Sequence, residues 1–235
     1  MNSENEAEST AVRIDGEGLV LRIDGRKGLS AESVALVSAV CDRAEDHAGR
    51  SRVIVHVSGI PDGVPPGDLT VALVSKWERA LRRLERLPAP TIAVADGDCG
   101  GLALEALLAT DYRIATDTVR LVVAVGDGAT WPGMALYRLA QHGVAAAAIR
   151  RAVLFGTPVD AADALALHLV DELVQDLPAA QATAGERAGA VTGTELAIRR
   201  QLMLDATTTT FEEALGVHLA ACDRALRRAA VGAAS

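Results

Sequence analysis

The sequence is poor in aromatic residues, in cysteine and in long apolar runs. Aromatic residues account for 3% of its 235 residues. The three cysteines, Cys41, Cys99 and Cys222, are far apart and form neither a C-x-x-C motif nor a Cys/His cluster with ligand spacing. Charged residues, glycine or proline interrupt each apolar stretch before the roughly 18 residues that a membrane-spanning helix needs. We therefore expect a reduced, cytoplasmic protein that binds no metal.

Several functional signatures are also missing. The sequence has no G-x-S-x-G motif, no Walker-type phosphate loop and no G-x-G-x-x-G motif, so serine hydrolase, P-loop and dinucleotide-binding functions have no support. A formal net charge of −8 leaves no basic surface for nucleic acid. Residues 1–10 lack the basic start and the apolar core of a signal peptide, and we expect them to form a disordered tail.

The patterning of the first sixty residues indicates an α/β fold. Residues 11–14 and 19–23 alternate apolar and polar side chains around a glycine-rich turn, which predicts a β-hairpin. A helix is expected after Ser30, because apolar residues recur there at helical spacing, and the β-branched run 53–57 predicts the next strand. A strand–helix–strand order favours a parallel sheet.

The most informative stretch runs from Thr91 to Asp111 and reads TIAVADGDCGGLALEALLATD. Residues 91–95 predict a buried strand that ends at the turn residues 96–98, and a helix is expected from Leu102. The first N–H groups of a helix have no partner within it and attract negative charge. Glu105 lies on the same helical face as Leu102, so a carboxylate is predicted beside a possible oxyanion site.

This stretch resembles, without a gap, the N-G-x-A-x-G-G-G-x-E-L-A-L-A-C-D signature of the crotonase (enoyl-CoA hydratase/isomerase) superfamily. Here residues 96–105 read DGDCGGLALE, and Asp111 closes the motif. The resemblance implies that the backbone N–H of Leu102 is one half of an oxyanion hole for a thioester carbonyl. It also implies that Glu105 is one of two acid/base carboxylates.

A second segment supports the same resemblance and extends it over nearly the whole chain. Residues 154–164 and 169–171 are similar to the family's T-G-x-x-I-x-A-x-x-A-x-x-x-G-L-V-D segment, with His168 where glycine is usual. The resemblance implies a crotonase-like spiral of ββα turns over residues 11–190. It further implies a C-terminal helical trimerisation region over residues 191–235, and hence a homotrimer or a hexamer.

Two positions depart from the family pattern. With the register fixed by Arg113-Ile114-Ala115 and Trp131-Pro132-Gly133, Val125 takes the place of the second hydratase glutamate. Valine can neither activate water nor deliver a proton, and Asp127 is the nearest replacement. In the loop 58–69, a proline takes the place of the residue that gives the second oxyanion N–H, and Gly67 is the alternative donor.

The resemblance implies a protein that acts on an acyl-CoA thioester, with coenzyme A as part of the substrate and no separate cofactor. It assigns coenzyme A contacts to Lys27, Gly28 and Leu29. Within the family, the chain is most similar to the small members that serve dihydroxyphenylglycine formation in glycopeptide antibiotic biosynthesis. These members work beside a type III polyketide synthase that makes 3,5-dihydroxyphenylacetyl-CoA. Two hypotheses follow: an enzyme that dehydrates or isomerises the synthase product, or a non-catalytic partner that binds and stimulates the synthase.

Overall fold

The computed structural model of the chain describes residues 13–15, 18–47, 51–63, 69–126, 128–142, 146–189 and 192–233. Among these residues, one large sheet contains β1 (Arg13–Asp15), β2 (Gly18–Asp24), β3 (Val53–Gly59), β4 (Thr91–Gly100), β5 (Tyr112–Thr116), β6 (Arg120–Val122), β9 (Val159–Asp160) and β10 (Glu172–Val174). A separate small sheet pairs β7 (Val125–Gly126) with β8 (Ala129–Thr130). The helices are α1 (Ala31–Asp46), α2 (Val71–Leu84), α3 (Leu102–Leu108), α4 (Met134–Gln141), α5 (Ala147–Phe155), α6 (Ala161–Ala166), α7 (Leu177–Ala188), α8 (Thr194–Asp205) and α9 (Phe211–Ala233).

The large sheet confirms the predicted α/β class. Its main path runs β1-β2-β3-β4-β5-β10, with β1 antiparallel to β2 and the other neighbours parallel. The hairpin predicted at the start of the chain is therefore present, and so is the helix expected after Ser30, whose side chain accepts a hydrogen bond from the Ser33 N–H. Because parallel strands need crossover connections, α1, α2 and α3 join successive strands of the sheet.

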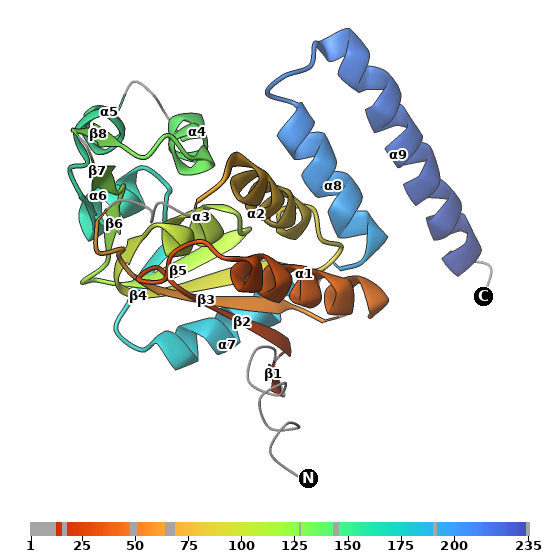
Figure 1. Cartoon of the computed structure of the whole chain (residues 1–235). Coiled ribbons are helices and arrows are strands. Elements are labelled where there is room, and N and C mark those ends of the chain that lie inside the picture. The colour runs from red at the N-terminus through yellow and green to blue at the C-terminus, as the bar shows by residue number, and fades with distance from the viewer. Residues whose placement is uncertain are drawn as a thin grey trace.

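Alternate residues of the central strands face two different helical layers. Val53, Val55 and Ala93 belong to the main core together with Trp77 of α2, whereas Ile54 and Ile92 pack with Ala184 of α7 on the opposite face. Figure 1 shows α1 and α2 on one side of the sheet and α7 on the other. Both faces of these strands are buried, which explains their almost continuous apolar sequence.

The strand predicted for residues 91–95 is longer than expected. We predicted that it ends at the turn residues after Ala95, and this was wrong, because β4 continues to Gly100. Gly97 adopts a φ of +65°, which bends the strand without ending it. The first half of β4 pairs with β5 and the second half pairs with β6. Beyond the bend, β4 therefore pairs with β6 in place of β5, just before α3 begins.

A buried ion pair fastens α8 to the core. Arg200 is 5% exposed and donates to Asp111 through Nε at 2.7 Å and Nη2 at 2.6 Å. Its guanidinium also donates to the backbone carbonyls of Leu87 and Ala89. Asp111 also accepts hydrogen bonds from the backbone N–H and the hydroxyl of Thr91. The aspartate that closes the central motif therefore joins β4 to the C-terminal helices.

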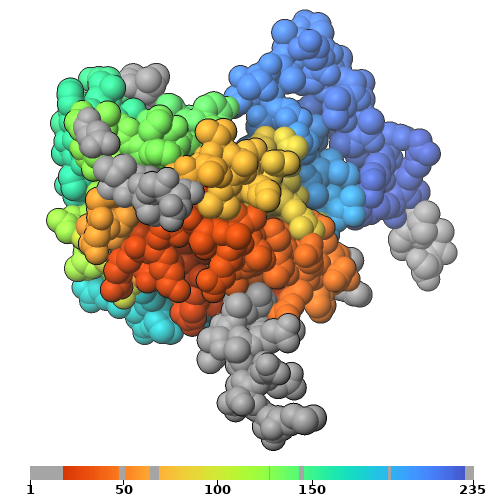
Figure 2. Space-filling model, in the orientation of Figure 1, coloured from red at the N-terminus to blue at the C-terminus, as the bar shows by residue number. Residues whose placement is uncertain are grey.

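The last helix stands apart from the sheet layers. Figures 1 and 2 show α8 and α9 side by side, with α9 on the outer side of α8. Large apolar side chains of α9 are exposed, with 75% of Phe211, 60% of Val217, 58% of Leu219 and 71% of Leu226 in contact with solvent. None of the helices in the described ranges combines the length and the apolar character that crossing a bilayer requires.

His168 occupies a backbone conformation that favours glycine. It has a φ of +54° and follows α6, where the His168 N–H donates to Leu165 and the Leu169 N–H donates to Ala164. This pair of hydrogen bonds is the Schellman arrangement, in which the residue at the position of His168 is usually glycine. The family's glycine at this position therefore has a conformational reason.

We predict that His168→Gly stabilises the protein. The side chain is exposed and its removal relieves left-handed strain, which outweighs the added freedom of glycine in the unfolded chain, so the free energy of unfolding should rise by roughly 0.5–1 kcal/mol. Urea denaturation measures the change. His168→Ala is the control, because it keeps the Cβ atom and should bring no gain; equal stabilisation by both variants would contradict the explanation.

Candidate active site

The candidate site lies where the carboxyl ends of β2, β3 and β4 meet. In parallel sheets this edge is where ligands bind, because the connecting loops converge there. Gly25, directly after β2, is close to the ends of β3 and β4, so that an added Cβ would lie 2.2 Å from the Gly59 carbonyl oxygen and 2.4 Å from that of Gly100. Only glycine permits this convergence, and the loops can therefore enclose a single pocket.

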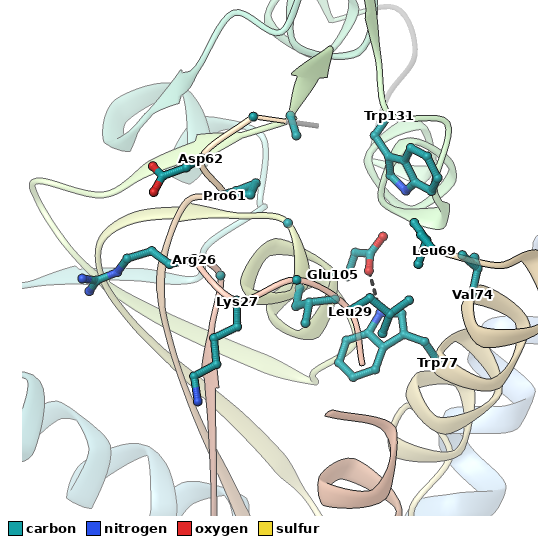
Figure 3. A pocket seen from close by; sticks show the side chains of 16 residues that line it. Arg26, Lys27, Leu29, Pro61, Asp62, Leu69, Val74, Trp77, Glu105 and Trp131 are labelled. Carbon is teal, nitrogen blue, oxygen red and sulfur yellow. Dashed lines mark hydrogen bonds between the residues drawn. The ribbon is translucent and has the colours of Figure 1, made fainter. Parts of the chain in front are cut away.

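The pocket has a volume of about 170 Å³ and is lined mainly by apolar side chains and glycine. Figure 3 shows it from close by, with Glu105 among the lining side chains, Trp77 on one side of it and Trp131 on the other. Its described lining residues are Gly25, Arg26, Lys27, Gly28, Leu29, Pro61, Asp62, Gly63, Leu69, Val74, Trp77, Gly101, Leu102, Glu105, Ala124 and Trp131.

Glu105 is the buried carboxylate of this pocket. It is 7% exposed, and its Oε2 accepts a hydrogen bond of 2.6 Å from the indole Nε1 of Trp77. Burial raises the pKa of Glu105 to about 7, and the charge of Glu78 acts in the same direction. The Trp77 hydrogen bond and the charge of Arg138 oppose the rise. Both protonation states of Glu105 are therefore present near neutral pH, as proton transfer requires.

The other oxygen of Glu105 lies against the start of α4. A Cβ on Gly133 would lie 2.8 Å from Glu105 Oε1 and 2.8 Å from Trp131 Nε1. Glycine at this position therefore leaves room for the carboxylate and for one edge of the indole ring. Glu105 is thus placed between Trp77 of α2 and the segment that carries Trp131, with Oε1 directed away from the Trp77 hydrogen bond (Figure 3).

Leu102 begins α3, so its backbone N–H has no acceptor within the helix. It follows Gly101, which has a φ of +52° and approaches Gly25 and Pro61 too closely to carry a larger side chain easily. Leu102 and Glu105 both line the pocket. The fold therefore brings together the two residues that the sequence predicted as oxyanion donor and acid/base group.

The residues predicted to contact coenzyme A also line the pocket. Lys27, Gly28 and Leu29 follow β2, and Figure 3 shows the side chains of Arg26 and Lys27 directed away from Glu105. Arg26 also pairs with Asp24, with 3.4 Å between its Nε and Oδ1 of the carboxylate. The pocket is therefore lined by exposed cationic side chains on one side and by the buried carboxyl group of Glu105 on another.

The described part of the chain includes only some of the predicted site residues. Gly67 and Asp127 lie outside the described residues, so the second oxyanion donor and the replacement acid/base group stay predictions. Val125 is 47% exposed and lies against Gly156, whereas its neighbour Ala124 lines the pocket. Among the described lining residues, the carboxylates are Glu105 and the exposed Asp62.

Sequence reasoning missed the tryptophans. The chain has two, and Trp77 and Trp131 both line this pocket although 54 positions separate them. Trp77 is 1% exposed and sits on the apolar face of α2, where a core role was the natural interpretation. The scarcity of aromatic residues was the available signal, but only the fold shows that both indoles lie beside one carboxylate.

A larger hollow of about 830 Å³ lies between the core and α8. Its lining includes Arg138 of α4, His142 directly after α4 and Arg200 of α8, and none of the described residues that the sequence predicted for the site. Arg138 and Arg200 are paired with carboxylates there. Within the described part of the chain, no group of three or more His, Cys, Asp or Glu side chains could hold a metal ion.

Comparison with known proteins finds sequence relatives and solved structures of the same fold. The chain is 56% identical to an "Enoyl-CoA-hydratase" of Amycolatopsis orientalis over 217 residues, which are 92% of this chain and 99% of the relative. An enoyl-CoA hydratase/isomerase from Marinobacter aquaeolei superposes with a TM-score of 0.74 at 17% identity, covering 92% of this chain and 90% of that one. An enoyl-CoA hydratase from Mycobacterium smegmatis also gives a TM-score of 0.74, at 18% identity and the same coverage. No protein-family model matches the chain.

Glu105→Gln should change how stability depends on pH. Because the pKa of Glu105 rises from 4.5 to about 7 on folding, the native state binds the extra proton and loses stability as pH rises through this range. Glutamine cannot lose a proton, so the variant should gain roughly 2–3 kcal/mol relative to the wild type between pH 5 and pH 8. Denaturant titrations at both pH values measure this difference. A constant difference between the two proteins would contradict the raised pKa.

Proposed function

The chain belongs to the enoyl-CoA hydratase/isomerase (crotonase) family, and we propose that it acts on an acyl-CoA thioester in the pocket that contains Glu105 and Leu102. The observation that carries this proposal is the meeting of a buried carboxyl group of raised pKa and the first N–H of α3 in one cavity. The N–H would donate a hydrogen bond to the thioester oxygen as negative charge develops on it, and Glu105 would move a proton on the adjacent carbon.

The substrate would enter with its coenzyme A moiety at the mouth of the pocket. We assign Lys27, Gly28 and Leu29 to coenzyme A, because they line the side of the pocket that carries cationic side chains. The coenzyme is part of the substrate, and the proposed chemistry needs no further cofactor. Gly67 is proposed as the second oxyanion donor, and Asp127 as a second acid/base group.

One carboxyl group is sufficient for elimination of water from a β-hydroxyacyl thioester. In this scheme the Glu105 carboxylate removes the α-proton, and the electron pair of the broken C–H bond delocalises onto the thioester oxygen, held by the Leu102 N–H. The enolate then forms the new C=C bond as the C–O bond breaks. Glu105 returns the same proton to the departing hydroxide, so water leaves and the carboxylate is restored. Addition of water to a simple enoyl thioester is the reverse of this path, so valine in the place of the second glutamate slows both directions, and elimination is favoured only where its product is strongly stabilised.

We further propose that the acyl group is aromatic or becomes aromatic during the reaction. Trp131 is half-buried and provides a flat apolar surface to the pocket, which suits a planar ring, whereas Trp77 is 1% exposed and orients Glu105 through its hydrogen bond. A type III polyketide synthase that leads to 3,5-dihydroxyphenylacetyl-CoA would supply a substrate of this kind, before its ring has become aromatic. The protein would assist that synthase by dehydrating and aromatising its product, in dihydroxyphenylglycine formation for antibiotic biosynthesis.

The alternative is a non-catalytic partner that binds the synthase and stimulates it. Val125, where the family carries a glutamate, is the observation that favours this alternative. The exposed apolar residues of α9 would also suit contact with another protein. The two functions differ in one respect, because only the enzyme needs a carboxyl group at position 105.

Turnover assays separate the two functions. We predict that the purified protein hydrates crotonyl-CoA far below the 1–10³ s⁻¹ of typical enzymes. With the synthase present, Glu105→Ala should lose the stimulation of 3,5-dihydroxyphenylacetyl-CoA formation, which chromatography of the products measures. Asp62→Ala, which removes an exposed carboxylate from the same pocket, is the control and should retain most of the stimulation.

The stimulation assay distinguishes the enzyme from the non-catalytic partner, and the hydration assay tests the position assigned to Val125. Stimulation that survives Glu105→Ala supports the non-catalytic partner. Rapid hydration of crotonyl-CoA by the wild type would show that the assignment of Val125 to the second glutamate position is wrong.

We also propose that the chain assembles as a homotrimer or a dimer of trimers. Leu215, Val217 and Leu219 of α9 are exposed in the single chain, whereas the apolar residues Leu196, Ile198 and Leu202 of α8 are already half-buried. Analytical ultracentrifugation should give the mass of three or six chains. Val217→Glu should reduce that mass by placing a charge in an apolar interface. A monomeric wild type that binds no other protein would remove the proposal.

A further inference from the structure

The indole N–H of Trp131 is a hydrogen-bond donor without a partner in the described part of the chain. Trp131 is half-buried and lines the same pocket as Glu105. No described residue accepts a hydrogen bond from its indole nitrogen, and the nitrogen itself is not buried. The second indole of the pocket differs, because Trp77 Nε1 donates to Glu105 Oε2 at 2.6 Å. The Trp131 N–H is therefore available to a bound molecule.

The backbone holds Trp131 at the wall of the pocket. Its backbone N–H donates to the carbonyl oxygen of Ala124 at 2.9 Å, and Ala124 also lines the pocket. On the other side of Trp131, Pro132 restricts the backbone and Gly133 begins α4 as its N-cap residue. The chain thus fixes this tryptophan on both sides while its ring N–H stays unused.

Gly133 gives the spacing between this N–H and the carboxyl group of Glu105. An added Cβ at Gly133 would lie 2.8 Å from Glu105 Oε1 and 2.8 Å from Trp131 Nε1, so these two atoms are at most twice that distance apart. Figure 3 shows the indole nitrogen of Trp131 on the edge of the ring that faces Glu105. Because one hydrogen bond spans about 2.7–3.0 Å, a single oxygen atom can contact both groups.

The two oxygens of Glu105 have different surroundings. Oε2 accepts the hydrogen bond from Trp77, which fixes the plane of the carboxyl group. Oε1 lies beside Gly133, where the absence of a side chain leaves it unobstructed. The oxygen that can exchange a proton with a ligand is therefore Oε1, and this is the oxygen nearest to the free N–H of Trp131.

We propose that Trp131 is a catalytic residue, whose indole N–H donates a hydrogen bond to the oxygen that leaves the β-carbon of the substrate. This inference rests on the proposed elimination, in which Glu105 returns a proton to the departing hydroxide. The departing oxygen must then contact Glu105 Oε1, and an oxygen bound there lies within reach of Trp131 Nε1. Trp131 thereby supplies, by a hydrogen bond, part of the assistance lost with valine at position 125.

Trp131 keeps its proton throughout this reaction. Glu105 takes the α-proton, the C–O bond breaks with its electron pair going to oxygen, and Glu105 then donates the proton that completes water. The indole is a donor only, so it stabilises the negative charge on the leaving oxygen without transferring a proton. Its contribution should be large for a strongly basic leaving group such as hydroxide and small for a weakly basic one such as acetate.

The test compares two leaving groups on one acyl chain. Elimination from 3-hydroxy-3-phenylpropionyl-CoA and from 3-acetoxy-3-phenylpropionyl-CoA gives the same product, cinnamoyl-CoA, which is measured by its absorbance. Trp131→Phe keeps a flat ring and removes the N–H. Its kcat for the hydroxy compound should fall roughly 10- to 100-fold with little change in KM, because a hydrogen bond to a charged oxygen is lost. The variant should keep most of its kcat for the acetoxy compound.

Trp77→Phe is the matched control. It removes the other indole N–H of the pocket, which acts on Glu105 itself. Both substrates need Glu105 to remove the α-proton, so this variant should slow the two eliminations in similar proportion. Circular dichroism checks that each variant folds. A Trp131→Phe variant that slows both substrates equally, or neither, would overturn the role of Trp131.

A second measurement leaves Trp131 unchanged. The chain has two tryptophans, so nitrogen-15 labelling of tryptophan gives two indole N–H resonances, and Trp77→Phe identifies the one from Trp131. In Glu105→Gln, which cannot remove the α-proton, the hydroxy compound should shift the Trp131 resonance downfield relative to 3-phenylpropionyl-CoA. These two ligands differ only in the hydroxyl group. Identical positions of the resonance with both ligands would contradict the hydrogen bond.

The same assays separate this inference from the proposed function. Elimination that is lost in Glu105→Ala, while Trp131→Phe matches the wild type on the hydroxy compound, removes the role of Trp131 alone. A wild type that eliminates neither hydroxide nor acetate removes the acid/base function of Glu105, and the role of Trp131 with it. Dependence on Glu105 for both substrates and on Trp131 for the hydroxy compound supports both.

Discussion

The buried carboxyl group of Glu105 is the constraint on which the arrangement of the site depends. A carboxylate that is 7% exposed needs compensation, and the structure provides one hydrogen bond from Trp77 and an arginine shared by two other carboxylates. The compensation is incomplete, so the proton affinity of the group rises toward neutrality. The same imbalance that is costly for folding therefore makes the residue suitable for proton transfer.

The architecture brings this group to the edge of the sheet where the loops converge. Gly25 allows the turn after β2 to approach β3 and β4, and Gly101 allows α3 to begin directly at the end of β4. Helix α2 then covers the sheet and brings Trp77 against Glu105. Arg200 joins the C-terminal helices to Asp111, at the other end of the motif that contains Glu105. The site and the C-terminal helices are thus coupled to the same segment of chain.

Much of the fold followed from local sequence, and the exceptions have local causes. The hairpin before Asp24, the helix after Ser30 and the buried strands were predicted because hydrophobic periodicity and capping act over a few residues. The end of β4 was wrong, because a glycine of positive φ can bend a strand as well as terminate it. Which of the two occurs depends on the partner strands, here β5 and then β6, which lie far along the chain.

The sequence by itself determined the α/β class, the resemblance to the crotonase family, and the meeting of Leu102 and Glu105, because all of these are written within one continuous motif. It could not determine the surroundings of Glu105. Trp77, Glu78 and Trp131 come from segments that no local pattern joins, and only the packing of α2 and α4 around α3 brings them together. The pKa of a carboxyl group depends on burial and on neighbouring charge, and both are properties of the tertiary structure alone.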